Sequence, residues 1–244
     1  MAKFLALAAV AASAAAQVEV VNGTDVPVSK YPFVTTIREA YALSPRCVAS
    51  LIAPKVLLAS ASCYSISPSG IYASIGTYLW DKDAELIKIV KQTPHPKFNS
   101  DTGDFDLAIF ELETESKAVP VALKFNEDAE NELGMALGFD LDDAEGVLME
   151  DDVKIWSNDD CAEAYGSDVL PSTMCAGGGD NDTCFFVPGT PLTITRNGVQ
   201  YVVGVGHSGD RCFEPGVPGS YSRVSAAHDF IQSFLSNTTT EPAS

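Results

Sequence analysis

The chain has 244 residues, of which 46% are hydrophobic and 20% charged, and its formal net charge is −18. That length suffices for one large or two modest domains with cores of their own. Binding to nucleic acid or to an anionic membrane depends on Lys and Arg to neutralise phosphates, so the acidic excess argues against both. It favours a basic protein partner or simply a solubilising surface.

The first residues have the pattern of a secretory signal peptide. Residues 1–16 contain a positive charge at Lys3, an apolar run from Phe4 to Ala12 and small residues at the end. The run is too short to cross a bilayer, and no later stretch reaches the roughly 20 apolar residues that a membrane helix needs. The sequence therefore predicts a secreted, extracellular protein without a membrane anchor.

Many short apolar runs rich in Val, Ile and Tyr follow, separated by Gly, Pro, Asn and Asp. This spacing predicts an antiparallel β-barrel or sandwich. Only residues 226–235 show helical periodicity, with an apolar face that ends at Leu235. The acidic stretch Asp140 to Asp152 is expected to be an exposed loop that leads into a strand. Examples of the predicted strands are Phe33–Ile37, Val48–Ile52, Val56–Ser60, Ile71–Ile75, Leu86–Val90, Leu107–Leu112 and Gln200–Val205.

The chain contains six cysteines, an even number that fits three disulfides in a secreted protein. Zinc is the competing use of cysteine. The sequence has no Cys-x-x-Cys pair and no Cys/His cluster, so neither a metal nor a cofactor is predicted.

The segment from Cys184 to Leu192 reads Cys-Phe-Phe-Val-Pro-Gly-Thr-Pro-Leu. It resembles the serine-protease nucleophile loop, Cys-x-Gly-Asp-Ser-Gly-Gly-Pro-Leu, with Pro188 in the place of the serine. Taken alone, the segment is better explained as a turn-rich disulfide loop of another β protein, and the rest of the chain decides between the two.

Further motifs occur in the order of trypsin-like serine proteases and cover nearly all of the mature chain. Each match is weak by itself, but the ordered series identifies the chain as a member of that family by resemblance. The matches are Val20–Thr24 with Ile-Val-Gly-Gly-Thr, Tyr31–Phe33 at the usual distance after it, Leu58–Cys63 with Leu-Thr-Ala-Ala-His-Cys, His95–Phe98 with His-Pro-x-Tyr, Asp106–Ile109 with Asp-Ile-Ala-Leu, Gly138–Phe139 with Gly-Trp, Met174–Gly177 with Met-Cys-Ala-Gly, Asp182–Cys184 with Asp-Ser-Cys, and Pro218–Val224 with Pro-Gly-Val-Tyr-Thr-Arg-Val.

The resemblance implies an all-β fold of two antiparallel six-stranded β-barrels with a C-terminal helix. The domain would cover residues 20–235, with barrels at about 20–118 and 119–225 and the helix at 226–235. Residues 17–19 would form a short pro-segment and residues 236–244 a polar tail. The implied disulfides use all six cysteines: Cys47–Cys63, Cys161–Cys175 and Cys184–Cys212.

The resemblance also assigns the catalytic positions. The triad aspartate is retained as Asp106, whereas Ser62 replaces the histidine and Pro188 replaces the serine. A serine hydroxyl has no useful proton affinity near neutral pH, so Ser62 cannot act as the base. Pro188 supplies neither a nucleophilic oxygen nor a backbone N–H for the oxyanion hole, and Phe186 stands where the other donor is usually a glycine. The protein is therefore expected not to be an enzyme.

Two further positions depart from the family pattern. Val187 stands where an aspartate receives the N-terminus released by activation, so cleavage before Val20 is expected to switch nothing on. His207 falls where a serine usually bonds to the triad aspartate. We expect it to form a buried pair with Asp106 that satisfies the carboxylate; the alternative is a relocated base.

A specificity pocket and glycosylation are also implied. Asp182, Gly209 and Gly219 resemble a trypsin-type pocket for Lys or Arg, although Ser208 replaces the usual tryptophan. The candidate N-glycosylation sequons begin at Asn22, Asn181 and Asn237.

Among inactive relatives of trypsin, the chain most resembles the glucanase inhibitor proteins that oomycete plant pathogens secrete. Its size, its signal, its Val-Val-Asn-Gly start and the loss of both histidine and serine carry that likeness. The resemblance implies a monomeric virulence effector that binds and inhibits a host plant endo-β-1,3-glucanase in the apoplast and suppresses defence. The alternatives are an active or weakly active trypsin-like endopeptidase and a non-inhibitory binding or adhesion pseudoprotease.

Overall fold

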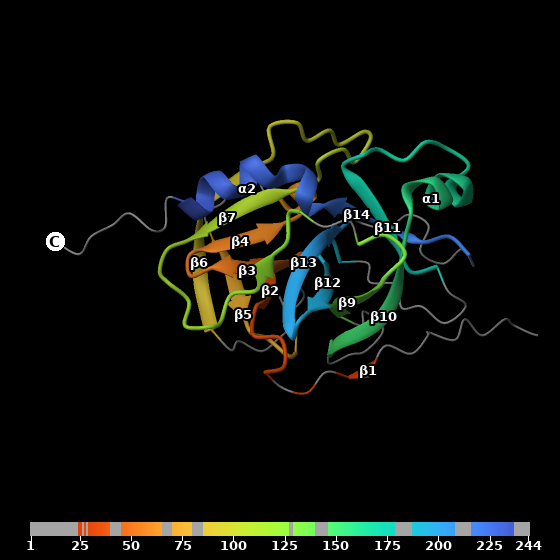
Figure 1. Cartoon of the computed structure of the whole chain (residues 1–244). Helices are drawn as coiled ribbons and strands as arrows, with labels where there is room; N and C mark the ends of the chain where they lie inside the picture. Colours follow the sequence, from red (N-terminus) through yellow and green to blue (C-terminus); the bar gives the residue numbers. More distant parts are fainter. Residues whose placement is uncertain are drawn as a thin grey trace, which may run out of the picture.

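The computed structural model describes residues 24–25, 27, 29–39, 45–64, 70–79, 85–126, 129–139, 146–178, 187–207 and 216–236. The predicted signal peptide, the pro-segment and the tail after residue 236 lie outside these ranges. Within them the chain forms two β-barrels that lie side by side, the first in orange to yellow-green and the second in green to blue (Figure 1).

The first barrel is closed by six antiparallel strands in the order β2-β3-β4-β7-β6-β5. Each strand is short and rich in Val, Ile, Leu and Ala, which suits a pleated surface buried on its inner face. The strands are β2 (Val34–Glu39), β3 (Cys47–Ala53), β4 (Val56–Ala59), β5 (Ile71–Ile75), β6 (Glu85–Pro94) and β7 (Ala108–Leu112).

The second barrel repeats this connectivity. Its strands follow the order β9-β10-β11-β14-β13-β12, and β9 pairs with β10 to close the ring. Two short strands add to it: β1 (Thr24–Asp25) on β10 and β8 (Ala122–Leu123) on β13. The predicted fold of two six-stranded antiparallel barrels is confirmed. The barrel strands are β9 (Leu133–Phe139), β10 (Leu148–Trp156), β11 (Thr173–Ala176), β12 (Pro191–Arg196), β13 (Val199–Gly206) and β14 (Gly219–Arg223).

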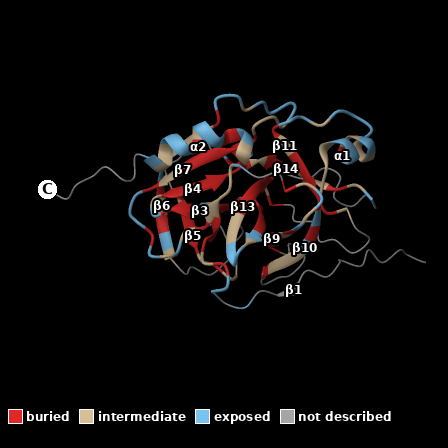
Figure 2. Ribbon diagram, in the orientation of Figure 1, coloured by how far each residue is buried: buried red, intermediate tan, exposed pale blue. Residues whose placement is uncertain are grey.

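The cores of the two barrels meet. The largest cluster of buried side chains extends from Leu51 and Phe110 in the first barrel to Phe139 and Val205 in the second. Figure 2 shows the strands largely buried, while exposed residues gather in loops and on the outer faces of the helices. Burial of this continuous apolar surface holds the barrels against each other and fixes any site that takes residues from both.

The C-terminal helix α2 (His228–Leu235), preceded by the 3-10 turn η2 (Val224–Ala227), returns from the second barrel to the first (Figure 1). Ile231 is fully buried, and the Phe230 ring lies edge-on to His95 at a centroid distance of 4.7 Å. The Lys91 ammonium lies 5.7 Å from the centre of the Phe234 ring. The apolar face expected from the sequence therefore packs against β6 and the turn that follows it.

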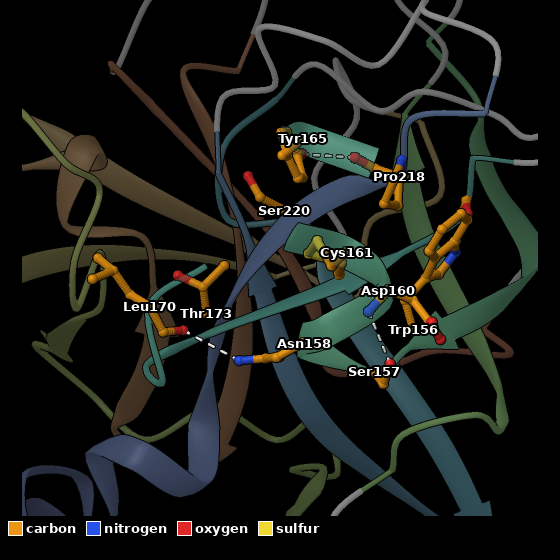
Figure 3. The surroundings of a disulfide bond; sticks show 12 residues. Trp156, Ser157, Asn158, Asp160, Cys161, Tyr165, Leu170, Thr173, Pro218 and Ser220 are labelled. Carbon is orange, nitrogen blue, oxygen red and sulfur yellow. Dashed lines mark hydrogen bonds between the residues drawn. A yellow bond between two sulfur atoms is a disulfide. The ribbon is translucent and has the colours of Figure 1, made fainter. Parts of the chain in front are cut away.

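A second helix, α1 (Asn158–Tyr165), was not predicted by the sequence. Its eight residues are mostly polar and only Cys161 is buried, so no apolar stripe marks it. The signals it does carry are its caps. The Ser157 hydroxyl accepts from the Asp160 amide at 3.1 Å (Figure 3). Gly166 ends the helix with a φ of 65°. No helix among the described residues has the length and apolar character needed to span a bilayer.

The end of the acidic stretch is not a loop. Residues 140–145 lie outside the described ranges, but Glu150 to Asp152 are part of β10. Glu150 is accommodated there because its carboxylate pairs with Lys30 and accepts a hydrogen bond from the Tyr31 hydroxyl. Its partners come from a distant segment of the chain, so a local pattern of acidic residues could not reveal them.

Candidate functional site

The structure brings together Ser62, Asp106 and Pro188, the three positions that the resemblance assigns to base, acid and nucleophile. Ser62 lies on the 3-10 turn η1 (Ala61–Cys63) after β4, and Asp106 precedes β7. Pro188 belongs to the loop before β12 in the second barrel. Cys63 Sγ lies 3.7 Å from the Pro188 carbonyl oxygen, so the loop of the second barrel touches η1 of the first.

Asp106 is 2% exposed. Among the described residues, two serines provide all the hydrogen bonds that its carboxylate accepts. Its Oδ2 accepts from the Ser60 hydroxyl at 2.8 Å and from the Ser62 hydroxyl at 3.0 Å, and its Oδ1 accepts from the Ser62 amide at 2.7 Å. These bonds meet the requirement that a buried carboxylate be paired with donors. A serine cannot take up a proton near neutral pH, so neither of the two serines bonded to Asp106 can act as its base.

His207 does not bond to Asp106 as expected. Its Nε2 lies 2.8 Å from the Ser222 hydroxyl and its Nδ1 lies 3.3 Å from the Ser220 hydroxyl, both on β14. The Asp106 carboxylate already accepts three hydrogen bonds from Ser60 and Ser62, while β14 places a hydroxyl next to each ring nitrogen of His207. The expected buried pair is therefore wrong as far as hydrogen bonding goes.

The charge of Asp106 still acts on His207. Burial lowers the pKa of His207 from its usual value of 6.5, and the negative charge of Asp106 opposes that shift only in part. The imidazole is therefore neutral at pH 7 and contributes no positive charge to the site.

The Pro188 loop is held between the two barrels by backbone hydrogen bonds. The Val48 amide of β3 donates to the Pro188 carbonyl at 2.9 Å, and the Gly189 amide donates to the Gly206 carbonyl at 2.8 Å. Gly189 has a φ of 95°, and a Cβ there would lie 1.8 Å from the Val48 carbonyl oxygen, so only glycine fits. The loop therefore has a fixed backbone that presents, at Pro188, neither a hydroxyl nor an N–H.

Val187 lies just before this loop and is 5% exposed in the shared core. The Thr190 hydroxyl donates to its carbonyl at 2.9 Å, which closes the turn. An apolar side chain in this environment cannot stabilise a charged N-terminus.

Two of the three expected disulfides are present. Cys47–Cys63 joins β3 to η1 with a Cα–Cα distance of 6.0 Å, and Cys161–Cys175 joins α1 to β11 at 6.2 Å (Figure 3).

Gly219, expected in the specificity pocket, begins β14. No group of three metal-binding side chains occurs among the described residues. The other predicted site residues lie outside the described ranges: Asn22, Asn181, Asp182, Cys184, Phe186, Ser208, Gly209, Cys212 and Asn237.

Sequence reasoning missed the serines that organise the site. Ser60, Ser220 and Ser222 belong to motifs that were recognised, but they were not assigned a role. A fourth, Ser172, donates to the Asp104 carboxylate and so ties the segment after α1 to the loop before Asp106. Small hydroxyl residues occur throughout the chain, and only their place in the fold distinguishes these four.

Two closed six-stranded barrels of like connectivity, with a site at their junction, define a trypsin-like β-barrel protein. A family model described as Trypsin matches residues 20–231, and the chain belongs to this family.

Three relatives show the range of proteins that the chain is similar to. It is 30% identical over 243 residues to glucanase inhibitor protein 1 of Phytophthora infestans, covering 94% of this chain and 93% of that protein. It is 33% identical over 230 residues to glucanase inhibitor protein 4 of the same organism, covering 87% and 88%. It is 32% identical over 237 residues to serine protease 56 of Homo sapiens, covering 89% of this chain but 39% of that protein.

Proposed function

We propose that this protein is a secreted, catalytically inactive relative of trypsin that binds a host plant endo-β-1,3-glucanase outside the cell and inhibits it. The observation that carries the proposal is the site itself: Asp106 is hydrogen-bonded by serines where a base would stand, and the facing loop presents Pro188. The relatives named glucanase inhibitor proteins support an inhibitory role and point to a glucanase as the partner.

Peptide hydrolysis on this fold needs a nucleophile, a base and an oxyanion hole. Ser62 is not basic, and Pro188 supplies neither an oxygen nor an N–H. In serine proteases the loss of a single triad member removes most of the rate enhancement, leaving about 10³- to 10⁴-fold over water from the oxyanion hole and binding. Here the hole would lose a donor as well, so turnover is expected at the background level.

The fold still provides what a binding protein needs. The barrels hold the loops around Ser62 and Pro188 in place through a disulfide and backbone hydrogen bonds. A specific protein interface of ordinary size buries about 1,600 Å² in total, or about 800 Å² on each partner. Secretion would bring the protein to an extracellular target, and the net charge of −18 would favour a basic one.

The test uses the purified mature chain with its disulfides formed. Hydrolysis of laminarin by a plant endo-β-1,3-glucanase is measured with increasing amounts of the protein, and active trypsin blocked by a covalent inhibitor serves as the matched control. The expected result is a saturable loss of glucanase activity with the protein and none with blocked trypsin. A complex that forms without loss of hydrolysis would instead indicate a non-inhibitory binding protein.

One observation favours the alternative of a weakly active peptidase: the imidazole of His207 lies within the electrostatic reach of Asp106. Both ring nitrogens are engaged with Ser220 and Ser222, however, and the facing loop offers no nucleophile. We expect no labelling by a fluorophosphonate and no cleavage of Arg or Lys esters, with or without the His207→Ala substitution. Turnover that disappears in His207→Ala would reverse this assignment.

A further inference from the structure

The site contains a small exposed side chain, Ser62, bonded to a buried carboxylate, Asp106. Ser62 is exposed, whereas Asp106 directly behind it is 2% exposed. Ser62 donates two of the three hydrogen bonds that the carboxylate accepts. Ser62 therefore connects the buried carboxylate to the exposed surface.

No described residue forms an ion pair with Asp106. Its donors are two hydroxyls and a backbone amide. His207 is held neutral by burial, and the Lys97 ammonium lies 5.3 Å from the centre of the Phe105 ring. The described part of the site therefore presents an uncompensated negative charge at low dielectric, where an opposite charge is attracted more strongly than at an open surface.

The Ser62 hydroxyl is oriented by its bond to Asp106. It gives its hydrogen to the carboxylate, so its lone pairs can only accept from outside. Lysine and arginine side chains carry N–H donors and no acceptors, which matches this orientation. An acidic side chain would find no hydrogen to accept from the Ser62 hydroxyl and would be repelled by the negative charge of Asp106.

The acceptor is also held rigidly. η1 is fixed by the Cys47–Cys63 disulfide and by the Ser60 hydroxyl, which accepts from the Ser62 amide at 3.1 Å. A group that is already oriented loses little conformational entropy when a ligand binds. The entropic cost of binding therefore falls mainly on the incoming side chain, which must also lose part of its hydration.

We propose that the site receives a lysine or arginine side chain of the protein partner above Ser62, held there by the charge of Asp106. This inference rests on the proposed function, because it names the kind of group that the glucanase inserts. The net charge of −18 draws a basic surface toward the protein, and the buried carboxylate selects the side chain that enters.

The first experiment measures the Kd for a plant endo-β-1,3-glucanase with two variants. Asp106→Asn removes the negative charge with little change of shape. Ser62→Lys gives the protein an ammonium group of its own at the place proposed for the partner's cation. We expect both to raise Kd by at least about tenfold, which corresponds to about 1.4 kcal/mol. The matched control is Asp101→Asn, which changes an exposed aspartate in the segment between β6 and β7. It is expected to leave Kd within about threefold. Thermal unfolding of each variant shows whether the fold is retained, and Ser62→Lys keeps the test valid if Asp106→Asn is unstable.

The second experiment does not need the glucanase. Ethylguanidinium is titrated into the protein and followed by NMR, with neutral ethylurea as the control of equal shape. We expect saturable shifts of the Ser62 and Cys63 amide signals with ethylguanidinium alone, and none in Asp106→Asn. If the wild-type protein shows these shifts but does not bind the glucanase, the proposed function fails and the cation site stands. Absence of the shifts, or glucanase binding that is indifferent to both variants, overturns the inference.

Discussion

Gly189→Ala is the substitution whose effect the structure defines most sharply. Gly189 follows Pro188 and has a φ of 95°, a conformation that costs an L-residue about 1–2 kcal/mol. The new Cβ would also lie 1.8 Å from the Val48 carbonyl oxygen, a contact that only a shift of β3 or of the loop can relieve. Overpacking of this kind costs typically about 1–3 kcal/mol more.

The expected total loss is therefore about 2–5 kcal/mol of unfolding free energy. Total stabilities are typically about 5–15 kcal/mol, so the loss is a large fraction of the whole. At about 2–4 °C per kcal/mol for a chain of this size, Tm should fall by about 10 °C. Urea unfolding of the disulfide-intact protein, followed by circular dichroism, measures the free energy directly.

Gly198→Ala is the matched control. Gly198 has a φ of 76° but no heavy atom within 4 Å of its ideal Cβ, so this variant carries the backbone cost without the collision. It should lose only about 1–2 kcal/mol. If the two glycine variants lose the same free energy, the close approach of the Pro188 loop to β3 contributes nothing to stability, and the reasoning about how this loop is held is refuted.

Three further outcomes are expected. Because burial lowers the pKa of His207, the unfolded chain binds its proton more readily than the folded one below pH 6.5, so stability is lost on acidification through that pH; His207→Gln should flatten this dependence in urea unfolding measured from pH 7 to pH 5. Burial first, and then the hydrogen bond to Glu150, raise the pKa of Tyr31 to about 12, so wild type should lose stability between pH 10 and pH 12 while Tyr31→Phe should not show that loss in the same assay. Ser157→Ala removes the cap of α1 and should cost about 1 kcal/mol, whereas Ser157→Asp should restore most of it; equal stability of all three proteins would show that the capping bond contributes nothing.

The sequence by itself determined the architecture. Alternation of short β-branched runs and turn residues predicted β2 to β7 and β13, and six of these seven runs lie within one or two residues of the observed strand at both ends. The exception is Leu86–Val90, since β6 extends to Pro94. The ordered family motifs then selected two barrels, and the disulfides Cys47–Cys63 and Cys161–Cys175 follow the implied pairing. These features depend on local patterns and on the order of motifs along the chain, both of which a sequence contains.

Only the tertiary structure decided which hydrogen bonds the site residues form. The sequence placed Ser62, Asp106 and His207 near one another, but it could not show that Ser60 and Ser62 bond to the carboxylate while the imidazole bonds to Ser222. Helix α1 escaped detection because a short, polar helix depends on its caps and its disulfide rather than on an apolar stripe. Hydrogen-bond partners are chosen by distances of a few tenths of an ångström between segments far apart in the chain, and those distances exist only once the barrels have packed together.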